Sequence, residues 1–418
     1  THSIIAGNIG GAFSINSLTG QLIVAGNIEF ETTSSYNLTV AVTDGLLTVV
    51  GTGLKTMPGG QKVRLPLLEQ AADAYEQFYK SNQDNPEIAM EWGWALTRLG
   101  RARVELGDYA GAEQNVRTAE SLFTKLADAA SGDPERGYAL ATSRVDIALI
   151  LVDLGQSEIA ESVLRTAVAT FEGLEKKSPE IVRYGDALAG TRIHLGNTLK
   201  ARHKYAEAQE SLQIAIGKYE AVVDAAPDEP RYRVGLVTSY KALGELFMET
   251  GSVEALTALR TAIEECQHLV NVIPDVPEYR ERLAASRLDY GMQLFAVGKW
   301  NEAALYYQAA VQEFLDLAAD DPDVPRFHES IALALNNRGV VLRSLGDYAA
   351  SELAHRRSLD EYTSLVKFQP QVLAHHVGLA GCRTSLGQLL RDLGRNRQAE
   401  AEFRAAIGRS GTGYHHRL

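Results

Sequence analysis

Histidine and carboxylate residues lie close together at a few points of the sequence, where they could hold a metal ion. His328-Glu329 begins like the His-Glu-x-x-His pattern of a zinc-binding helix, in which two histidines on one helix face bind the metal. Ala332 stands where the second histidine would be needed. The other histidine pairs, at 375–376 and 415–416, are adjacent in sequence and would point to different faces of a helix. The sequence therefore predicts no zinc site at these positions.

Nucleophilic chemistry has no better support. No Ser-His-Asp or Cys-His arrangement stands out, and the carboxylates are spread along the chain as solvated faces. The two cysteines, Cys266 and Cys382, fall in different repeats of the pattern described below, too far apart for a disulfide. Small buried packing residues are the expected role for both. We therefore expect no catalytic residues, no enzymatic activity and no cofactor.

The composition limits the classes of partner. The 418 residues are 45% hydrophobic and 22% charged, as in ordinary globular proteins. The formal net charge of −12 disfavours a general role in binding nucleic acid or an anionic membrane surface, but leaves room for a basic peptide partner. No apolar run approaches the roughly 20 residues that cross a bilayer, so membrane insertion is not expected.

A period of 48 residues organises most of the chain. One slot recurs at this spacing with a single 47-residue step, and it is occupied by Gly107, Gly155, His203, Gly251, Gly298, Gly346 and Gly394. Seven residues earlier stands a second small residue, such as Gly100, and later columns of small residues begin at Ala112 and Ala119. Proline marks the breaks between units, as in Asp133-Pro134-Glu135, a helix stop-and-restart signal. A fixed period in this range predicts a solenoid of helical hairpins in which small residues allow close packing.

This pattern resembles the tetratricopeptide repeat, whose Leu-Gly and two alanine positions match Leu99-Gly100, Ala112 and Ala119, although the usual unit has 34 residues. The resemblance implies a mostly α fold, a right-handed α-solenoid. Its parts are half a repeat at 65–85, containing the second helix only, and seven repeats of about 48 residues at 86–418. Long units of this kind also resemble the arrays that follow kinase domains in some bacterial Ser/Thr protein kinases.

The resemblance further implies a concave groove, lined by the first helix of each repeat, that holds a partner peptide or helix. Asn197, Lys200 and Lys241 resemble part of a clamp that grips acidic C-terminal peptides, and Leu288, Met292 and Phe295 form an expected apolar patch. The full set of expected groove residues is Arg101, Asn197, Lys200, Lys241, Glu245, Met292, Phe295, Asn336, Arg343 and Arg391. An alternative reading of these positions is that they are solvated or pack between helices.

The first fifty residues have a different character. Segments such as 12–16, 21–26 and 36–44 alternate apolar and polar residues between Gly, Asn and Ser breaks, which predicts strands. The succession from Ile4 to Gly45 resembles the second half of a cadherin-like repeat, which implies that the first strands of that sandwich are missing. Residues 51–64 are expected to be a linker before the helical part.

The cadherin resemblance raises the question of calcium. Cadherin calcium sites use an Asp-Arg-Glu motif, and Glu29-Phe30-Glu31 holds that place here. Calcium takes six to eight oxygen ligands, which Glu29 and Glu31 do not supply by themselves. They are the only metal candidates, with solvated edge carboxylates as the alternative.

Three functions remain open from the sequence. The first is a non-catalytic protein-interaction scaffold that binds a protein or peptide. The second is a cell-envelope or adhesion protein with cadherin-like modules, and the third is the regulatory repeat region of a bacterial multidomain Ser/Thr kinase. A functional cadherin-like piece would place the chain outside the cytoplasm, whereas the repeats by themselves are typical of the cytoplasm.

Overall fold

The computed structural model describes residues 13–15, 22–24, 60–81, 85–129 and 132–410. The chain divides into two units, residues 1–204 and 205–418, and each is described by itself. Unit 1 contains strands β1 and β2 and helices α2 to α7, and unit 2 contains helices α8 to α16. The elements are β1 Phe13–Ile15, β2 Leu22–Val24, α2 Gly60–Ser81, α3 Pro86–Glu105, α4 Tyr109–Ala129, α5 Pro134–Asp153, α6 Ser157–Lys177, α7 Val182–Ala201, α8 Tyr205–Ala225, α9 Pro230–Thr250, α10 Ala255–Val272, α11 Pro277–Ala296, α12 Trp300–Asp320, α13 Pro325–Ser344, α14 Tyr348–Phe368, α15 Leu373–Asp392 and α16 Asn396–Ser410.

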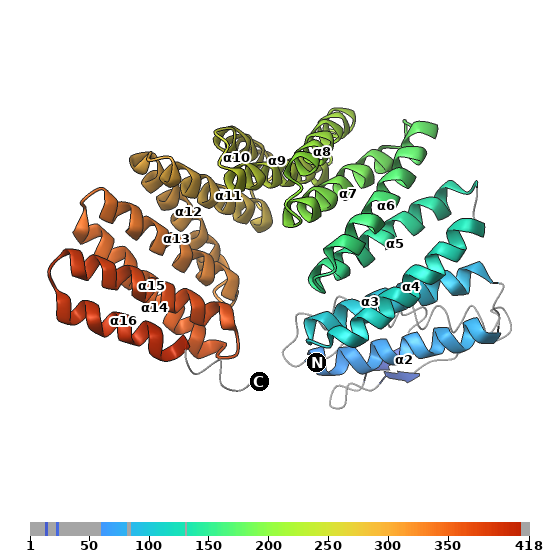
Figure 1. Ribbon diagram of the computed structural model, residues 1–418, viewed down its shortest axis with the longest axis horizontal. Helices are drawn as coiled ribbons and strands as arrows, with labels where there is room; N and C mark the ends of the chain where they lie inside the picture. Colours follow the sequence, from blue (N-terminus) through green and yellow to red (C-terminus); the bar gives the residue numbers. More distant parts are fainter. Residues whose placement is uncertain (1–12, 16–21, 25–59, 82–84, 130–131, 411–418) are drawn as a thin grey trace. The chain divides into compact units, whose positions relative to one another are not determined.

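Within each unit, successive helices pack side by side as antiparallel neighbours (Figure 1). After α2, the described helices alternate between a first and a second helix of each repeat, beginning with α3 and α4. The helix-period pattern predicted from the sequence is therefore confirmed, and the chain is mostly α-helical.

The recurring glycine slot forms the turn between the two helices of a pair. Gly107 has φ +80°, and the amide of Asp108 donates to the carbonyl of Arg103 at 2.9 Å, which closes the end of α3. This is the left-handed helix ending that glycine adopts without a side-chain clash. His203 occupies the same slot with φ +58° and is the one non-glycine residue with positive φ among the described residues.

The small-residue columns are packing positions, as the sequence predicts. Ala112 and Ala119 are completely buried, and so are their equivalents in α6, α8 and α12. A Cβ atom added at Gly339 would lie 2.6 Å from the ring of His355, and one at Gly291 would lie 2.9 Å from Tyr307. A large side chain on the second helix thus fills the space that the missing side chain leaves on the first.

Side chains cap the first helix after two of the breaks between pairs, at α3 and α5. Asn85 Oδ1 accepts a hydrogen bond of 2.9 Å from the amide of Glu87, and Asp133 Oδ1 accepts one of 3.0 Å from Glu135. A proline follows each cap at the first helical position, where its missing N–H costs no hydrogen bond. These contacts confirm the stop-and-restart signal read from Asp133-Pro134-Glu135.

Helix α2 begins earlier than the sequence suggests. It starts at Gly60, inside the stretch 51–64 that was expected to be a linker, and continues past Pro66. Residues 61–64, which include Gln, Lys and Arg, favour a helix, so the helix extends upstream of the proline. Leu68 and Tyr75 of α2 are buried, and the helix packs against α3.

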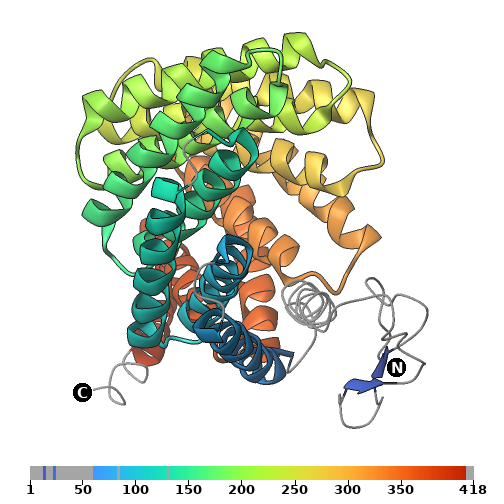
Figure 2. The ribbon, with the colours of Figure 1, turned by 90° about the vertical axis from the view of Figure 1, so that its right-hand side faces the viewer.

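Strands β1 and β2 form an antiparallel pair in which Phe13 faces Val24 and Ser14 faces Ile23 (Figure 2). They correspond to the first two strands expected from the sequence. The third expected strand at 36–44, the two glutamates Glu29 and Glu31, and the rest of the expected β segment at 1–50 lie outside the described residues.

Candidate binding surfaces on the first helices

The first helices lie on the inner side of each stack. In unit 1, α3 contacts α5 and α5 contacts α7, and in unit 2, α11 contacts α13 and α13 contacts α15. Among the described residues, the second helices of neighbouring pairs have no comparable contact. Elements on the inner side of a curved stack approach each other most closely, so the exposed surface of the first helices forms the inner face of each unit.

In unit 1, the inner face carries paired charges. Arg101 on α3 forms an ion pair with Asp153 on α5. Burial raises the pKa of nearby Asp146 above its usual value, although the charges of Arg101 and Arg98 act in the opposite direction. The other two expected groove residues of this unit lie on α7, where Asn197 is exposed and Lys200 is half-buried.

In unit 2, a similar pair joins α9 to α11. Lys241 Nζ lies 2.9 Å from Oδ2 of Asp289. Burial raises the pKa of Asp289, Lys241 lowers it, and the charge of Glu245 raises it further, with a net shift upward. Lys241 is therefore half of an ion pair, and its neighbour Glu245 adds a second carboxylate to the same place.

The expected apolar patch on α11 is divided between surface and core. Met292 is 41% exposed, whereas Leu288 is buried in the core that α11 shares with α12 and α13. Phe295 is half-buried against the same core, and its ring lies 6.4 Å from that of Trp300. Of these three residues, only Met292 offers a largely accessible side chain.

The remaining expected residues lie on α13 and α15. Asn336 Oδ1 lies 3.1 Å from Nδ1 of the buried His355 and therefore has a structural contact. Arg343 donates to Oε1 of Gln388 at 2.8 Å and lies 3.5 Å from Asp392. Arg391 is exposed at the end of α15.

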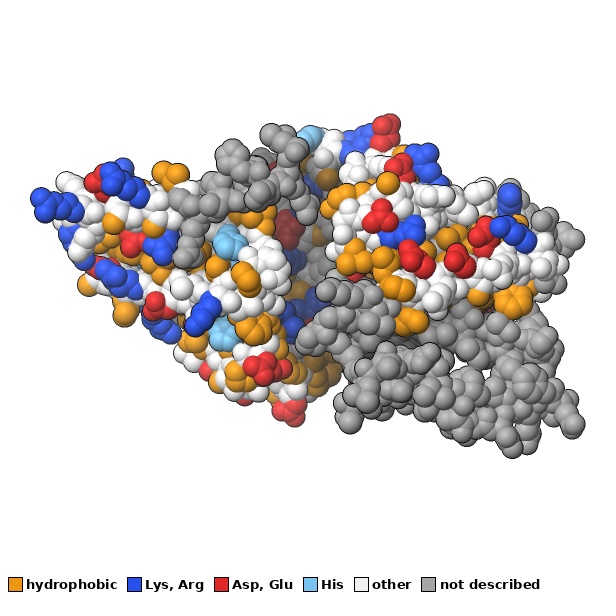
Figure 3. Space-filling view, turned by 90° about the horizontal axis from the view of Figure 1, so that it is seen from below, with side chains coloured by type: hydrophobic (Ala, Val, Ile, Leu, Met, Phe, Trp, Pro, Cys, Tyr) orange, Lys and Arg blue, Asp and Glu red, His pale blue; other side chains and the backbone are white. Residues whose placement is uncertain are grey.

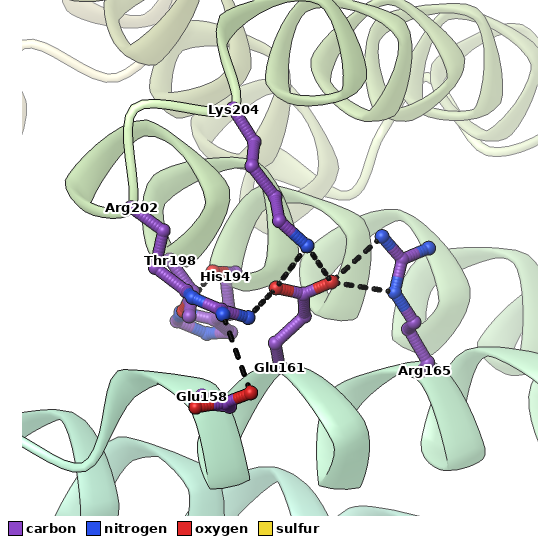
Figure 4. Close-up of polar contacts among 7 residues, drawn as sticks. All are labelled: Glu158, Glu161, Arg165, His194, Thr198, Arg202 and Lys204. Carbon is purple, nitrogen blue, oxygen red and sulfur yellow. Dashed lines mark hydrogen bonds and ion pairs between the residues drawn. The ribbon is translucent and has the colours of Figure 1, made fainter.

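Glu161 lies at the centre of a cluster of charged side chains (Figure 4). Its carboxylate accepts hydrogen bonds from Lys204 at 2.9 and 3.0 Å, from Arg165 at 3.0 Å, and from Arg202. Burial tends to raise the pKa of Glu161, but the hydrogen bonds from Lys204 and Arg165 outweigh it and lower the pKa. The Glu161 side chain is 7% exposed, so the carboxylate is occupied on nearly all sides.

The same cluster recurs elsewhere in the array. Glu352 is bonded to Arg356 in its own helix and to Arg395 in the turn of the next repeat, just as Glu161 is bonded to Arg165 and Lys204. A contact that repeats with the structural period holds neighbouring repeats together. The Glu161 cluster is therefore a structural contact between repeats rather than a reactive centre.

The histidine that resembled a zinc ligand has a similar explanation. His328 Nδ1 lies 2.9 Å from Glu361 Oε2, and Arg280 makes the equivalent contact with Glu313 at 2.7 Å one repeat earlier. His328 thus takes the place of an arginine that bridges a first and a second helix. No group of three or more potential metal-binding side chains gathers among the described residues. The pair at 415–416 lies outside them.

Both cysteines are buried thiols, as expected. Cys266 Sγ lies 3.7 Å from the hydroxyl of Ser286, and Cys382 donates to the backbone carbonyl of His355 at 3.3 Å. Burial raises the pKa of Cys382 to about 11. A thiol that stays protonated and faces a carbonyl is a packing group.

Comparisons with known proteins agree with this architecture. Residues 331–369 and 380–412 each match a model described as a tetratricopeptide repeat. Two of the repeats in unit 2 are thus similar to tetratricopeptide repeats. Two solved structures share the α-solenoid fold of this chain: a signal-transduction ATPase with a tetratricopeptide repeat sensor from Pyrococcus horikoshii, and yeast Tom70. The ATPase is 12% identical with a TM-score of 0.52, and the match covers 90% of this chain and 53% of the ATPase chain. Tom70 is 13% identical with a TM-score of 0.50, and the match covers 92% of this chain and 66% of the Tom70 chain.

The N-terminal stretch has a separate similarity. Residues 1–57 match a model of the cadherin domain. Neural-cadherin of Drosophila melanogaster is 44% identical over 45 residues, which are 11% of this chain and 2% of that protein. The chain thus spans a very small part of the cadherin that it matches.

Three acids that the sequence analysis did not single out pair with expected groove cations. Asp153, Asp289 and Asp392 each pair with an expected groove cation, and each lies on the next first helix along the stack. The signal was available, because each acid follows its partner by about one repeat length. These pairs join neighbouring repeats, so they cannot be recognised from the charges of a single repeat.

On the face seen in Figure 3, Lys and Arg side chains are interspersed with Asp and Glu. None of the described helices is long and apolar enough to cross a bilayer.

Proposed function

We propose that this chain is a non-catalytic protein-interaction scaffold, and that the inner faces of its first helices bind a partner peptide or helix. The single observation that carries the proposal is a contrast between two kinds of position. The recurring small residues of the second helices are buried in packing contacts, whereas one first-helix slot that is exposed or half-buried in every repeat varies between cationic, acidic, amide and apolar side chains. That slot contains Arg101, Leu149, Asn197, Glu245, Met292, Val340 and Gln388.

Charge and burial support the same proposal. Arg101, Lys241 and Arg343 are part-exposed in ion pairs that connect neighbouring first helices. Such pairs contribute little to stability at a surface, typically up to about 1 kcal/mol, so a binding partner can replace or join them at small cost. The chemically suggestive clusters at Glu161 and His328 repeat as structural contacts and do not compete with this interpretation.

A displayed random peptide library tests the proposal. Peptides selected on the intact chain should lose binding when groove residues of unit 2 change, as in Lys241→Glu or Met292→Glu. They should retain binding in Leu305→Glu, which alters an exposed residue on the second helix α12. Selected peptides whose binding survives the groove changes would contradict the proposal.

The cadherin similarity favours a second candidate, an adhesion or cell-envelope role. It rests on the match of residues 1–57 to the cadherin model. Calcium binding through Glu29 and Glu31 belongs to this candidate. Calorimetric titration of the chain with calcium tests it, because heat that disappears in Glu31→Gln would support the role and its absence at millimolar calcium would count against it.

A further inference from the structure

The hairpin turns of unit 2 carry a row of exposed apolar side chains. Val297, Leu345 and Leu393 follow the last turns of α11, α13 and α15, one repeat length apart. Trp300 and Tyr348 begin the second helices α12 and α14, three residues after the first two of them. All five residues are between 37% and 45% exposed. We call them the turn edge of unit 2.

Contacts between repeats hold the last two of these turns together. Arg343, near the end of α13, lies 3.5 Å from Asp392 at the end of α15. Arg395, in the turn after α15, donates to Glu352 of α14 at 2.6 Å. The turn after α11 occupies the same place one repeat earlier, where α11 contacts α13. The apolar residues of successive turns therefore lie next to one another along one edge.

Two acids beside the turn edge are each shared by two arginines. Asp392 lies 3.5 Å from Arg343 and 4.0 Å from Arg391. Glu352 accepts hydrogen bonds from Arg395 at 2.6 Å and from the arginine one turn along its own helix at 2.7 Å. Each group of two arginines and one acid has one net positive charge.

The other charged groups at these turns do not cancel this charge. Arg397, at the start of α16, is exposed and has no ion pair within the part of the chain that the structure describes. Lys299 and Glu302 lie 3.4 Å apart and neutralise each other. Asp347, which accepts a hydrogen bond from the amide that follows it by three residues, offsets one positive charge. The turn edge is thus net positive, in a chain whose formal net charge is −12.

We propose that the turn edge of unit 2 binds an acidic amphipathic segment of a partner protein. Apolar side chains of the segment cover Trp300, Leu345 and Tyr348, and its carboxylates contact Arg391 and Arg397. An apolar row with a charged rim is typical of an interaction surface, and the uncompensated arginines select a partner of opposite charge. This surface goes beyond the inner face of the proposed scaffold function, which it meets at Arg391.

Three synthetic fluorescein-labelled peptides of equal length, all without tryptophan, test the inference by fluorescence anisotropy on the intact chain. The first combines Asp and Leu in an amphipathic helical pattern, the second replaces every Asp by Lys, and the third replaces every Leu by Ser. At about 0.15 M salt the general repulsion by the acidic chain is largely screened, whereas close contacts with the arginines remain. We expect the Asp/Leu peptide to bind at least about tenfold more tightly than either of the others.

Variants locate the site. Arg391→Gln with Arg397→Gln should remove most of the preference for Asp over Lys, because these two arginines supply charge that no nearby acid fully compensates. Val297→Ser with Tyr348→Ser should remove most of the preference for Leu over Ser. Circular dichroism checks that each variant keeps its helical content.

Two exposed positions away from the turns provide matched controls. Arg404→Gln changes an arginine further along α16, and Leu305→Ser changes a leucine further along α12. Neither variant should alter either preference.

Tryptophan fluorescence gives a second measurement that needs no polar substitution in the turn edge. Trp300 is one of three tryptophans, and the other two, Trp92 and Trp94, lie on α3 in unit 1. Binding of the Asp/Leu peptide should reduce quenching by acrylamide in the wild type. The reduction should be absent in Trp300→Phe.

Equal binding of the Asp/Leu and Lys/Leu peptides, control variants as damaging as the turn-edge variants, or protection from acrylamide that persists in Trp300→Phe would overturn the inference. Self-association of the chain that Val297→Ser with Tyr348→Ser abolishes would assign the edge to a second copy and would also overturn it. Lys241→Glu, which tests the scaffold proposal on the inner face, should leave binding of the Asp/Leu peptide unchanged. Loss of that binding in Lys241→Glu would place the peptide on the inner face and contradict a separate turn-edge site, so the two proposals can fail independently.

Discussion

Lys204 Nζ lies 2.9 Å from Oε1 of Glu161, so the turn after α7 is tied to the preceding second helix α6. Arg395 and Glu352 make the same contact at 2.6 Å in unit 2. In both cases the acid also bonds to an arginine one turn along its own helix. The array is thus held together by polar contacts that recur with its period, in addition to its buried small residues.

Removing the Glu161 carboxylate tests this contact. Glu161→Gln should lower the free energy of unfolding by about 2 kcal/mol, because Arg202 and Lys204 would lose their counterion at a largely buried position. The equivalent change Glu352→Gln should have a smaller effect, since the Glu352 side chain is more exposed. Urea unfolding followed by circular dichroism measures both. Equal stability of the wild type and Glu161→Gln would contradict the structural role.

The same carboxylate should make stability depend on pH. Hydrogen bonds from Lys204 and Arg165 overcome the effect of burial and hold the pKa of Glu161 below its usual 4.5. Its stabilisation is therefore complete above pH 4.5 and is lost as the pH falls through the lower folded-state pKa. The difference in urea midpoint between wild type and Glu161→Gln should shrink over that acidic range. A difference in urea midpoint that stays constant down to strong acid would contradict the role of the Glu161 carboxylate in this pH dependence.

His355 should produce a second pH effect at milder acidity. It is fully buried between α13 and α14, and burial, followed by the charge of Arg343, lowers its pKa from 6.5 to about 4. Because the unfolded chain binds the proton more readily, stability should fall by roughly 3 kcal/mol as the pH drops from 6.5 to 4.

The variant His355→Leu isolates this effect, because Leu259 fills the same slot in α10. The thermal unfolding temperature of the variant should depend less steeply on pH between 6.5 and 4 than that of the wild type. A dependence that is equally steep in both proteins would show that another group titrates there.

The turn slot predicts opposite outcomes for two substitutions. Gly251 has φ +70°, and Gly251→Ala should lower the free energy of unfolding by about 1 kcal/mol because alanine is strained in this conformation. His203 already bears that strain at φ +58°, so His203→Gly should leave stability unchanged or raise it. Urea midpoints compare the two, and a loss of stability in His203→Gly would contradict the shared turn geometry.

Most of the helical fold was predictable from sequence because its signals are local and repeated. The glycine slot, the buried columns of Ala112 and Ala119, and the caps before Pro86 and Pro134 all depend on contacts within one hairpin. The start of α2 was misplaced because the glycine-rich composition of 51–60 extended the expected linker to residue 64, whereas the helix-forming residues at 61–64 belong to the helix.

The binding surface was harder to predict because its contacts cross from one repeat to the next. Leu288 was expected in the apolar patch of the groove, but its side chain is buried in the core that α11 shares with α12 and α13. Lys241 and Arg343 were expected to be accessible cations. In the structure they pair with Asp289 and Asp392, which lie about one repeat later in the sequence. Burial and pairing at such positions follow from the packing of neighbouring hairpins, which sequence spacing reveals only when repeats are compared in register.

The most direct measurement is photo-crosslinking of a library-selected peptide to the intact chain. A benzophenone-bearing amino acid replaces either Met292 on the inner face or Leu305 on the second helix α12, both of which are exposed. If the first helices form the binding surface, the peptide should crosslink at position 292 and not at position 305. Crosslinking at position 305 with none at position 292 would contradict the assignment of the inner face as the site where this scaffold binds its partner.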